Sequence, residues 1–140
     1  MDIARNSLKR LKTLRHPSIL TYIDSLETDK YILIVTEHVQ PLQCFLKEMS
    51  KWPEQQKESA ISWGIYSISK GVCFLNNDCK MVHGNLSLSS IYINDSSDWK
   101  LFHFEYLTNI GSSQPVKSFY SHKIYTAPEL QDSNRATSDK

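Results

Sequence analysis

Several features are scarce in this sequence of 140 residues, and each scarcity excludes a class of protein. The three cysteines form an odd set without a C-x-x-C pair, so neither a disulfide framework nor a cysteine zinc site is expected. No apolar run approaches the ~18 residues that a membrane-spanning helix needs. The first ten residues lack the apolar segment of a signal peptide. We therefore expect a cytoplasmic protein without a transmembrane segment.

An excess of one sign of charge is absent too. Lysine and arginine number 16 against 15 aspartates and glutamates, which leaves a formal net charge of +1. This balance predicts no general affinity for nucleic acid or for an anionic membrane surface. Hydrophobic residues make up 40% and charged residues 22%, a composition typical of a globular chain. The length suits one domain.

Histidines and aromatic residues suggest two binding sites that we considered and set aside. The histidine spacing matches no metal-ligand pattern, so we expect no metal site and interpret His83 as a packed core residue; the five are His16, His38, His83, His103 and His122. Lys117 and Lys123 flank aromatic residues at positions 119, 120 and 125. Such a cluster is found on peptide- or nucleic-acid-binding surfaces, but two lysines carry little weight.

The first third of the chain predicts a helix, a hairpin and a second, short helix. Apolar residues recur at three- and four-residue spacing over residues 3–15, and His16-Pro17 ends that helix. Its other face is basic and either binds an acidic partner or is simply solvated; it carries Lys9, Arg10, Lys12 and Arg15. Residues 19–26 and 31–36 predict two strands of a hairpin, the second of them buried. Pro41 breaks the chain before a short helix at 42–49.

The remainder predicts a long helix followed by short strands. Apolar residues cover so much of residues 54–77 that this helix is predicted to be buried in the core. Residues 80–83, 91–93 and 99–104 are β-prone, and the turn at 94–98 predicts a hairpin between the last two. A loop is expected over residues 108–122, and a short helical segment begins at 127–130.

Four motifs in a fixed order now resemble those of protein kinases. Residues 14–19 read Leu-Arg-His-Pro-Ser-Ile, like the turn after the kinase C helix. Residues 83–90 (His-Gly-Asn-Leu-Ser-Leu-Ser-Ser), 103–105 (His-Phe-Glu) and 127–129 (Ala127, Pro128, Glu129) resemble the catalytic loop, the magnesium-binding motif and the Ala-Pro-Glu motif. The stretches at residues 8–17, 35–37, 61–64 and 99–101 resemble those of the Scy-like (SCY1-like) pseudokinases, the family to which the resemblance is closest.

This resemblance implies an α+β fold, a protein-kinase-like fold present in part. Residues 1–40 would supply the end of the N-lobe, with its C helix and hairpin, and the hinge. Residues 41–140 would supply the first half of the C-lobe, with an activation-segment-like loop at about residues 103–129. We expect a fragment, because Glu129 lacks its usual arginine partner and no Gly-rich strand or strand lysine precedes the first helix.

The resemblance also implies that the catalytic positions are degenerate. Asn85 stands where the catalytic base would be, and an amide cannot accept the proton of the substrate. Ser90 and His103 replace the two magnesium ligands, although imidazole is a poor ligand for a hard cation. Ser7 replaces the glutamate of the C helix and cannot pair with a lysine. We therefore expect no kinase activity.

Positions that build the scaffold are retained in the same alignment. An apolar column that joins the kinase lobes corresponds to Leu11, Tyr22, His83 and Phe104. Thr36, Glu37 and Val39 align with the gatekeeper and hinge, where they would either offer backbone hydrogen bonds to a purine or only connect a strand to a helix. Tyr92 aligns with the residue under adenine and would crowd the purine. Weak or absent ATP binding, and no other cofactor, is the expectation.

The function implied is that of a non-catalytic scaffold for proteins. By resemblance, it would act in Golgi–ER vesicle traffic at the cytoplasmic periphery of Golgi membranes, with vesicle-coat proteins bound through regions outside this chain. Two alternatives remain: a pseudokinase that still binds ATP as a structural ligand, and a weakly active kinase with relocated catalytic residues.

Overall fold

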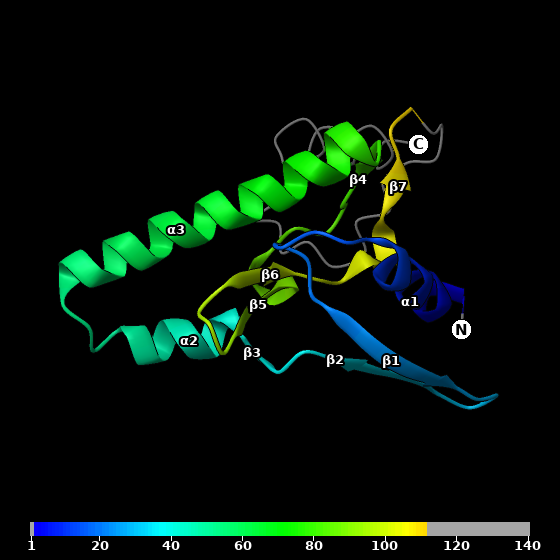
Figure 1. The fold of residues 1–140 in the computed structure, drawn as a ribbon, viewed down its shortest axis with the longest axis horizontal. Helices are drawn as coiled ribbons and strands as arrows, with labels where there is room; N and C mark the ends of the chain where they lie inside the picture. Colours follow the sequence, from blue (N-terminus) through cyan, green and yellow to red (C-terminus); the bar gives the residue numbers. More distant parts are fainter. Residues whose placement is uncertain (1, 112–140) are drawn as a thin grey trace, which may run out of the picture.

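The computed structural model describes residues 2–111, which form an open assembly of helices and short antiparallel sheets (Figure 1). In chain order the elements are α1 (Asp2–Thr13), β1 (Tyr22–Glu27), β2 (Ile32–Thr36), β3 (Val39–Pro41), α2 (Leu42–Met49), α3 (Glu54–Cys73), the π-helical turn η1 (Phe74–Asp78), β4 (Met81–Val82), the 3₁₀ turn η2 (Leu88–Ser90), β5 (Ile91–Asn94), β6 (Trp99–Leu101), the 3₁₀ turn η3 (Phe104–Tyr106) and β7 (Thr108–Asn109).

Three small antiparallel sheets organise the described residues. The hairpins β1–β2 and β5–β6 confirm the two predicted hairpins. Two other pairings were not predicted: β3 joins β5, and β4 pairs with β7 inside the segment expected to be a loop. The segment after α1 also joins the centre, because the Leu101 amide donates to the Ser18 carbonyl over 2.7 Å and the Leu20 amide to the Leu101 carbonyl over 3.0 Å.

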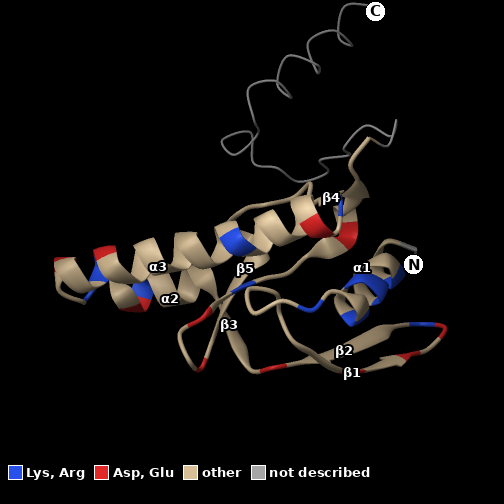
Figure 2. Ribbon diagram, turned by 45° about the horizontal axis from the view of Figure 1, so that its top comes forward, with Lys and Arg blue, Asp and Glu red and all other residues tan. Residues whose placement is uncertain are grey.

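α1 packs as an amphipathic helix mainly against the η3 turn. Leu8, Leu11 and Leu14 are buried at three-residue spacing, as the pattern predicts. The helix ends at Thr13, two residues earlier than predicted. Figure 2 shows lysine and arginine along α1. Three of these side chains are engaged: Arg10 Nη1 lies 3.5 Å from the Met81 sulfur on β4, Arg5 pairs with Glu27, and Lys12 lies over the Tyr22 ring.

α3 crosses the β5–β6 hairpin at glycine residues (Figure 1). A Cβ atom at Gly64 would overlap the indole of Trp99 on β6, so only glycine permits this approach. One further contact occurs seven residues later, where a Cβ at Gly71 would lie 3.2 Å from Cβ of Ser18. After Cys73 the helix continues as η1, whose wider π-type winding accounts for the rest of the predicted helix.

The predicted burial of two elements is wrong. On α3 only a narrow stripe at Gly64, Ile68 and Gly71 is buried, whereas the apolar residues beside it face outward; the exposed ones are Ile61, Trp63, Ile65 and Tyr66. The strand β2 is likewise not buried, because Leu33 and Val35 lie on the uncovered face of a two-stranded sheet. β6 is also shorter than predicted, since the chain turns into η3.

Three of the four residues of the predicted apolar column are buried near the contact between α1 and η3. Leu11, His83 and Phe104 are buried, and the ring of His83 stands edge-on to Phe104 with centroids 5.6 Å apart. His83 Nε2 lies 2.8 Å from the Phe102 carbonyl. Burial lowers the pKa of His83, against the raising effects of that hydrogen bond and of Glu105.

Tyr22 lies at the edge of the core rather than inside it. Its hydroxyl is 2.8 Å from Ser25 Oγ, and the ammonium of Lys12 lies over its ring. Among residues 2–111, no helix is both long and apolar enough to cross a membrane. The predicted segment at 127–130 and the aromatic cluster around Lys117 lie outside the described residues.

We expect Gly64→Ala to lower the free energy of unfolding by about 1–3 kcal/mol, because the new methyl group overpacks against the Trp99 indole. This cost exceeds the ~1 kcal/mol gained in helix propensity. Urea denaturation measures it, with Ser62→Ala on the exposed side of α3 as the matched control. The cost should shrink in a Trp99→Leu background; an equal cost there would contradict the proposed contact.

Acidification is expected to destabilise the protein below about pH 6.5, the ordinary pKa of histidine. Because the pKa of His83 is lowered in the folded state, the unfolded chain binds more protons as the pH falls. The stability that His83 contributes is therefore complete above the pKa of histidine in the unfolded chain. It is lost as the pH falls toward the lower pKa of His83 in the folded protein, with a slope of at most about 1.4 kcal/mol per pH unit.

Urea unfolding at several pH values between about 5 and about 7.5 tests this slope. The variant His83→Gln retains an amide donor for the Phe102 carbonyl but does not titrate, so its stability should depend less on pH. Some slope should remain, because burial also lowers the pKa of His16. An unchanged slope in His83→Gln would show that His83 is not responsible.

Candidate functional site

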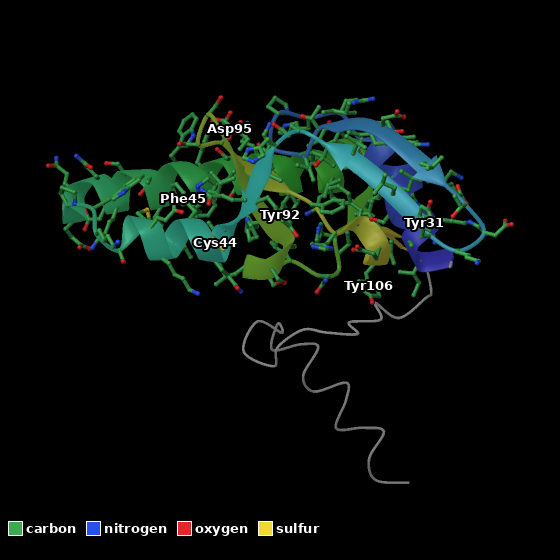
Figure 3. The ribbon with its side chains drawn as sticks, turned by 90° about the horizontal axis from the view of Figure 1, so that it is seen from below. Tyr31, Cys44, Phe45, Tyr92, Asp95 and Tyr106 are labelled. Atoms are coloured by element: carbon green, nitrogen blue, oxygen red, sulfur yellow. The ribbon has the colours of Figure 1, made fainter. Side chains whose placement is uncertain are left out.

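Three side chains from residues 92–105 form one chain of hydrogen bonds. The Tyr92 hydroxyl on β5 lies 3.0 Å from Nε2 of His103, and Nδ1 of His103 lies 3.1 Å from Oε1 of Glu105. Figure 3 shows Tyr92 between β3 and the η3 turn that carries Tyr106. The ring of Phe102 packs on His103 with centroids 4.8 Å apart. Both ring nitrogens of His103 are therefore engaged.

The backbone of His103 adopts a left-handed conformation. Its φ is 63° and its ψ is 62°, at the point where the chain leaves β6 and enters η3. Residues with a Cβ atom adopt this region at a cost of roughly 1–2 kcal/mol, although histidine is one of the more tolerant types. The two hydrogen bonds of the ring offset this cost, which indicates that the ring position is specified by its surroundings.

The pKa values of the neighbours determine where the protons lie. Burial, and then the charge of Glu105, raises the pKa of Tyr92, so the phenol is neutral. Burial is the largest single influence on Glu105 and would raise its pKa, but the hydrogen bond from His103, a backbone hydrogen bond and the nearby His103 and His83 together lower the net pKa. In the tautomer in which the phenol donates to Nε2, Nδ1 carries the imidazole proton and donates it to the Glu105 carboxylate.

Two buried oxygen atoms near this network have no hydrogen-bond partner within the described part of the chain. They are Oγ of Ser7 on α1 and the second carboxylate oxygen, Oε2, of Glu105 on η3. α1 packs directly on η3, so these two unpaired oxygen atoms belong to the elements of one interface. Ser7, predicted to be a degenerate site position, is therefore buried and does not bind Glu105 or any other described residue.

The second predicted position, Ser90, is used inside its own turn. Its side chain is fully buried, accepts from the Ser87 amide over 3.0 Å and donates to the Ser87 carbonyl over 2.8 Å. Its carbonyl also accepts the Phe102 amide over 2.9 Å. Asn85 lies nearby, and its backbone amide donates to Nδ1 of His83 over 3.3 Å. The hydroxyl of Ser90 thus closes a capping box and is not directed at a ligand.

The segment that joins β2 to β3 is held by a partly buried ion pair. The carboxylate of Glu37 accepts the Thr21 amide over 2.9 Å and the Asn94 side-chain amide over 3.1 Å, and lies 3.5 Å from the ammonium of Lys100. Burial opposes ionisation, but these partners together lower the pKa of Glu37. The Lys100 ammonium also donates to the Pro17 carbonyl over 2.7 Å.

The other two residues of the predicted hinge have backbone roles. Thr36 Oγ1 donates to the Glu37 carbonyl over 3.0 Å, and Val39 pairs with Asn94 where β3 meets β5. Each of the predicted hinge residues therefore contributes to the connection between a strand and the centre of the fold.

The structure brings some of the predicted positions together and not others. Tyr92 and His103 are in contact, and Ser90 is joined to the same end of β6, whereas Ser7 lies across the α1 interface. Sequence reasoning included Glu105 in the 103–105 motif but missed its contact with His103. It also missed the role of Ser87, whose spacing of three from Ser90 fits a capping box. No group of metal-ligating residues occurs within residues 2–111.

Comparison with known proteins now identifies the family. The model of the protein kinase domain matches residues 2–140. The Dictyostelium discoideum "Probable inactive serine/threonine-protein kinase scy1" is 41% identical over 110 residues, which are 79% of this chain and 13% of that protein. The mouse "Protein-associating with the carboxyl-terminal domain of ezrin" is 32% identical over 114 residues, 81% of this chain and 15% of that protein.

Among solved structures, the crystal structure of Cex1p matches with a TM-score of 0.65 and 26% sequence identity, covering 81% of this chain and 20% of that chain. The chain thus spans between 13% and 20% of the length of these proteins. The mixed helix-and-strand fold, the order of the motifs and these matches agree. The chain belongs to the protein kinase domain family, as a part of a kinase-like fold with SCY1 and SCY1-like pseudokinases among its relatives.

Proposed function

We propose that this chain is part of a catalytically inactive kinase-like domain whose role is to bind other proteins. The observation that carries the proposal is the Tyr92–His103–Glu105 chain, in which the residue at the main magnesium position is held by two hydrogen bonds. The name of the Dictyostelium relative, a probable inactive kinase, supports the same conclusion.

The residues at the catalytic positions do not fit magnesium and ATP. His103 would have to give up Tyr92 or Glu105 before either ring nitrogen could bind a ligand, and neutral imidazole is a poor partner for a hard cation. Ser90 has already committed its hydroxyl to Ser87. At Asn85 an amide replaces the base, so no group there accepts a proton from a substrate hydroxyl.

The purine-facing positions support the same proposal. Tyr92, which the resemblance puts under adenine, is a large side chain whose hydroxyl is hydrogen-bonded to His103. Glu37 turns its carboxylate toward Lys100 and Asn94 and so belongs to the scaffold. We therefore propose that ATP and other cofactors are not needed for the folded state.

A role in binding proteins is supported by the relatives. One mouse relative is named for its association with the carboxyl-terminal domain of ezrin. By resemblance to the SCY1 proteins we propose a scaffold in Golgi–ER vesicle traffic, in the cytoplasm at Golgi membranes, with coat proteins bound by regions beyond this chain. Since the chain spans a small part of its relatives, those partners belong to this proposal only.

Thermal-shift titration with millimolar ATP, with and without Mg²⁺, tests the loss of nucleotide binding. We expect no saturable rise in the unfolding midpoint, because a ligand stabilises only the state that binds it. A catalytically competent kinase titrated under the same conditions serves as the positive control. A saturable shift that grows with Mg²⁺ would overturn the proposal and favour a pseudokinase that uses ATP as a structural ligand.

The remaining alternative, a weakly active kinase, requires a transfer assay. Radiolabelled ATP incubated with a full-length relative of this chain and a generic substrate should yield no labelled protein. Any residual signal should be unchanged by Asn85→Ala, because the amide takes no part in proton transfer. Activity that disappears in Asn85→Ala would instead assign Asn85 a catalytic role.

A further inference from the structure

A groove of about 330 Å³ runs along one flank of α3, on surface that the kinase-like site does not use. One wall comes from the helix and the other from the turn after α1 together with the start of β6; the residues used below are Trp63, Tyr66, Lys70, Pro17, Asp98 and Trp99. Its size lies within the range of sites that hold small ligands or a few side chains of a peptide.

Two large aromatic side chains form the helical wall and are not core residues. Trp63 is 56% exposed and Tyr66 is 53% exposed, with ring centroids 5.7 Å apart and planes tilted by 33°. They lie on the opposite flank of the buried Gly64–Ile68–Gly71 stripe from Ile65, as a period of 3.6 residues requires. Exposed tryptophan and tyrosine next to a concavity are the residues that dominate binding energies in protein interfaces.

The length of the groove follows from the two glycine contacts on α3. Trp99 meets the helix at Gly64, and Ser18 meets it at Gly71. Seven residues of α-helix span about 10.5 Å. The start of β6, including Asp98, therefore lies at the N-terminal end of the groove, and the turn after α1 lies at its C-terminal end.

The charges at the two ends are opposite. Lys70 lies at the C-terminal end with its ammonium 5.4 Å from the centre of the Tyr66 ring. His16 adds no positive charge there at neutral pH, because burial lowers its pKa. The charge of Lys100 is balanced by Glu37, 3.5 Å away. Asp98 remains as the negative group at the other end. The groove therefore has a positive end and a negative end, which would orient a charged ligand.

We propose that this groove binds a short proline-containing segment of a partner protein, with an acidic side chain at the Lys70 end and a basic one at the Asp98 end. Proline rings pack flat on aromatic walls, and a polyproline II segment loses little conformational entropy on binding. Such a segment rises 3.1 Å per residue, so acidic and basic residues three positions apart span about 9 Å, close to the length of the groove. The inference rests on the proposed interaction role and names the class of partner.

The test uses four fluorescein-labelled, end-blocked peptides whose central residues are Glu-Pro-Pro-Lys, Glu-Ala-Ala-Lys, Glu-Pro-Pro-Glu and Lys-Pro-Pro-Lys. Fluorescence anisotropy against the full 140-residue chain should show saturable binding of the first. The others should bind at least about tenfold more weakly, because each lacks either the proline rings or one of the matching charges. Equal binding of all four would overturn the proposal, as would no saturable binding of any.

Variants locate the site. Trp63→Ala should weaken binding of the Glu-Pro-Pro-Lys peptide at least about tenfold, whereas the matched truncation Ile65→Ala, 59% exposed on the other flank, should not change it. Lys70→Glu should weaken the same peptide and strengthen Lys-Pro-Pro-Lys, because both ends of the groove are then negative. Equal losses in Trp63→Ala and Ile65→Ala, with native far-UV circular dichroism, would place the peptide elsewhere and sink the inference.

The two proposals fail separately. Saturable ATP binding in the thermal-shift titration would overturn the inactive, nucleotide-free assignment and leave the peptide result intact. Failure of the peptide to bind, with no ATP shift, would remove only the groove proposal, because nothing at Tyr92 or His103 takes part in it.

Discussion

The ammonium group of Lys100 holds together segments that lie far apart in the sequence. It contacts the Pro17 carbonyl and the Glu37 carboxylate, and Glu37 in turn accepts hydrogen bonds from Thr21 and Asn94. The turn after α1, the link between β2 and β3, and both strands of the β5–β6 hairpin therefore share one charge network. Removing one partner would leave the other charge unpaired, at a cost below the ~3–5 kcal/mol of a fully buried pair because the Glu37 carboxylate is partly exposed.

Both faces of the molecule depend on where this network fixes β6. After the end of β6, His103 contacts Tyr92. At its start, Trp99 contacts α3 at Gly64, and the preceding residue, Asp98, lines the groove. The same three-residue strand thus positions the degenerate site and the proposed peptide groove. A shift of β6 would alter both, although they share no side chain.

Sequence reasoning predicted the elements whose signals are local. The turn at 94–98 and the periodicity of α1 specify neighbouring residues, and both features are found. The pairings β3–β5 and β4–β7 depend on contacts between distant segments only two or three residues long, for which no periodic pattern exists. Apolar residues occur on both flanks of α3, so the pattern does not indicate which flank is covered. The prediction of a buried helix therefore included Trp63, which is exposed.

The candidate site was predicted as a set of positions and not as a geometry. Alignment to the motifs identified Tyr92 and His103. Their contact accompanies the left-handed backbone at His103, which no local sequence pattern predicts. The contact of Glu105 was overlooked because kinases have a glycine, and not a ligand, at that position of the motif. Ser90 was judged by its poor metal affinity, whereas its hydroxyl is in fact satisfied within its own turn.

The pairing of Leu20 with Leu101 has a consequence for the order of events during synthesis. α1 is synthesised about 80 residues before the strand that anchors the segment behind it. At roughly 5–20 residues per second, that interval lasts about 4–16 s. During this time the apolar stripe of α1 lacks η3, its main packing partner, which leaves it accessible to a ribosome-associated chaperone.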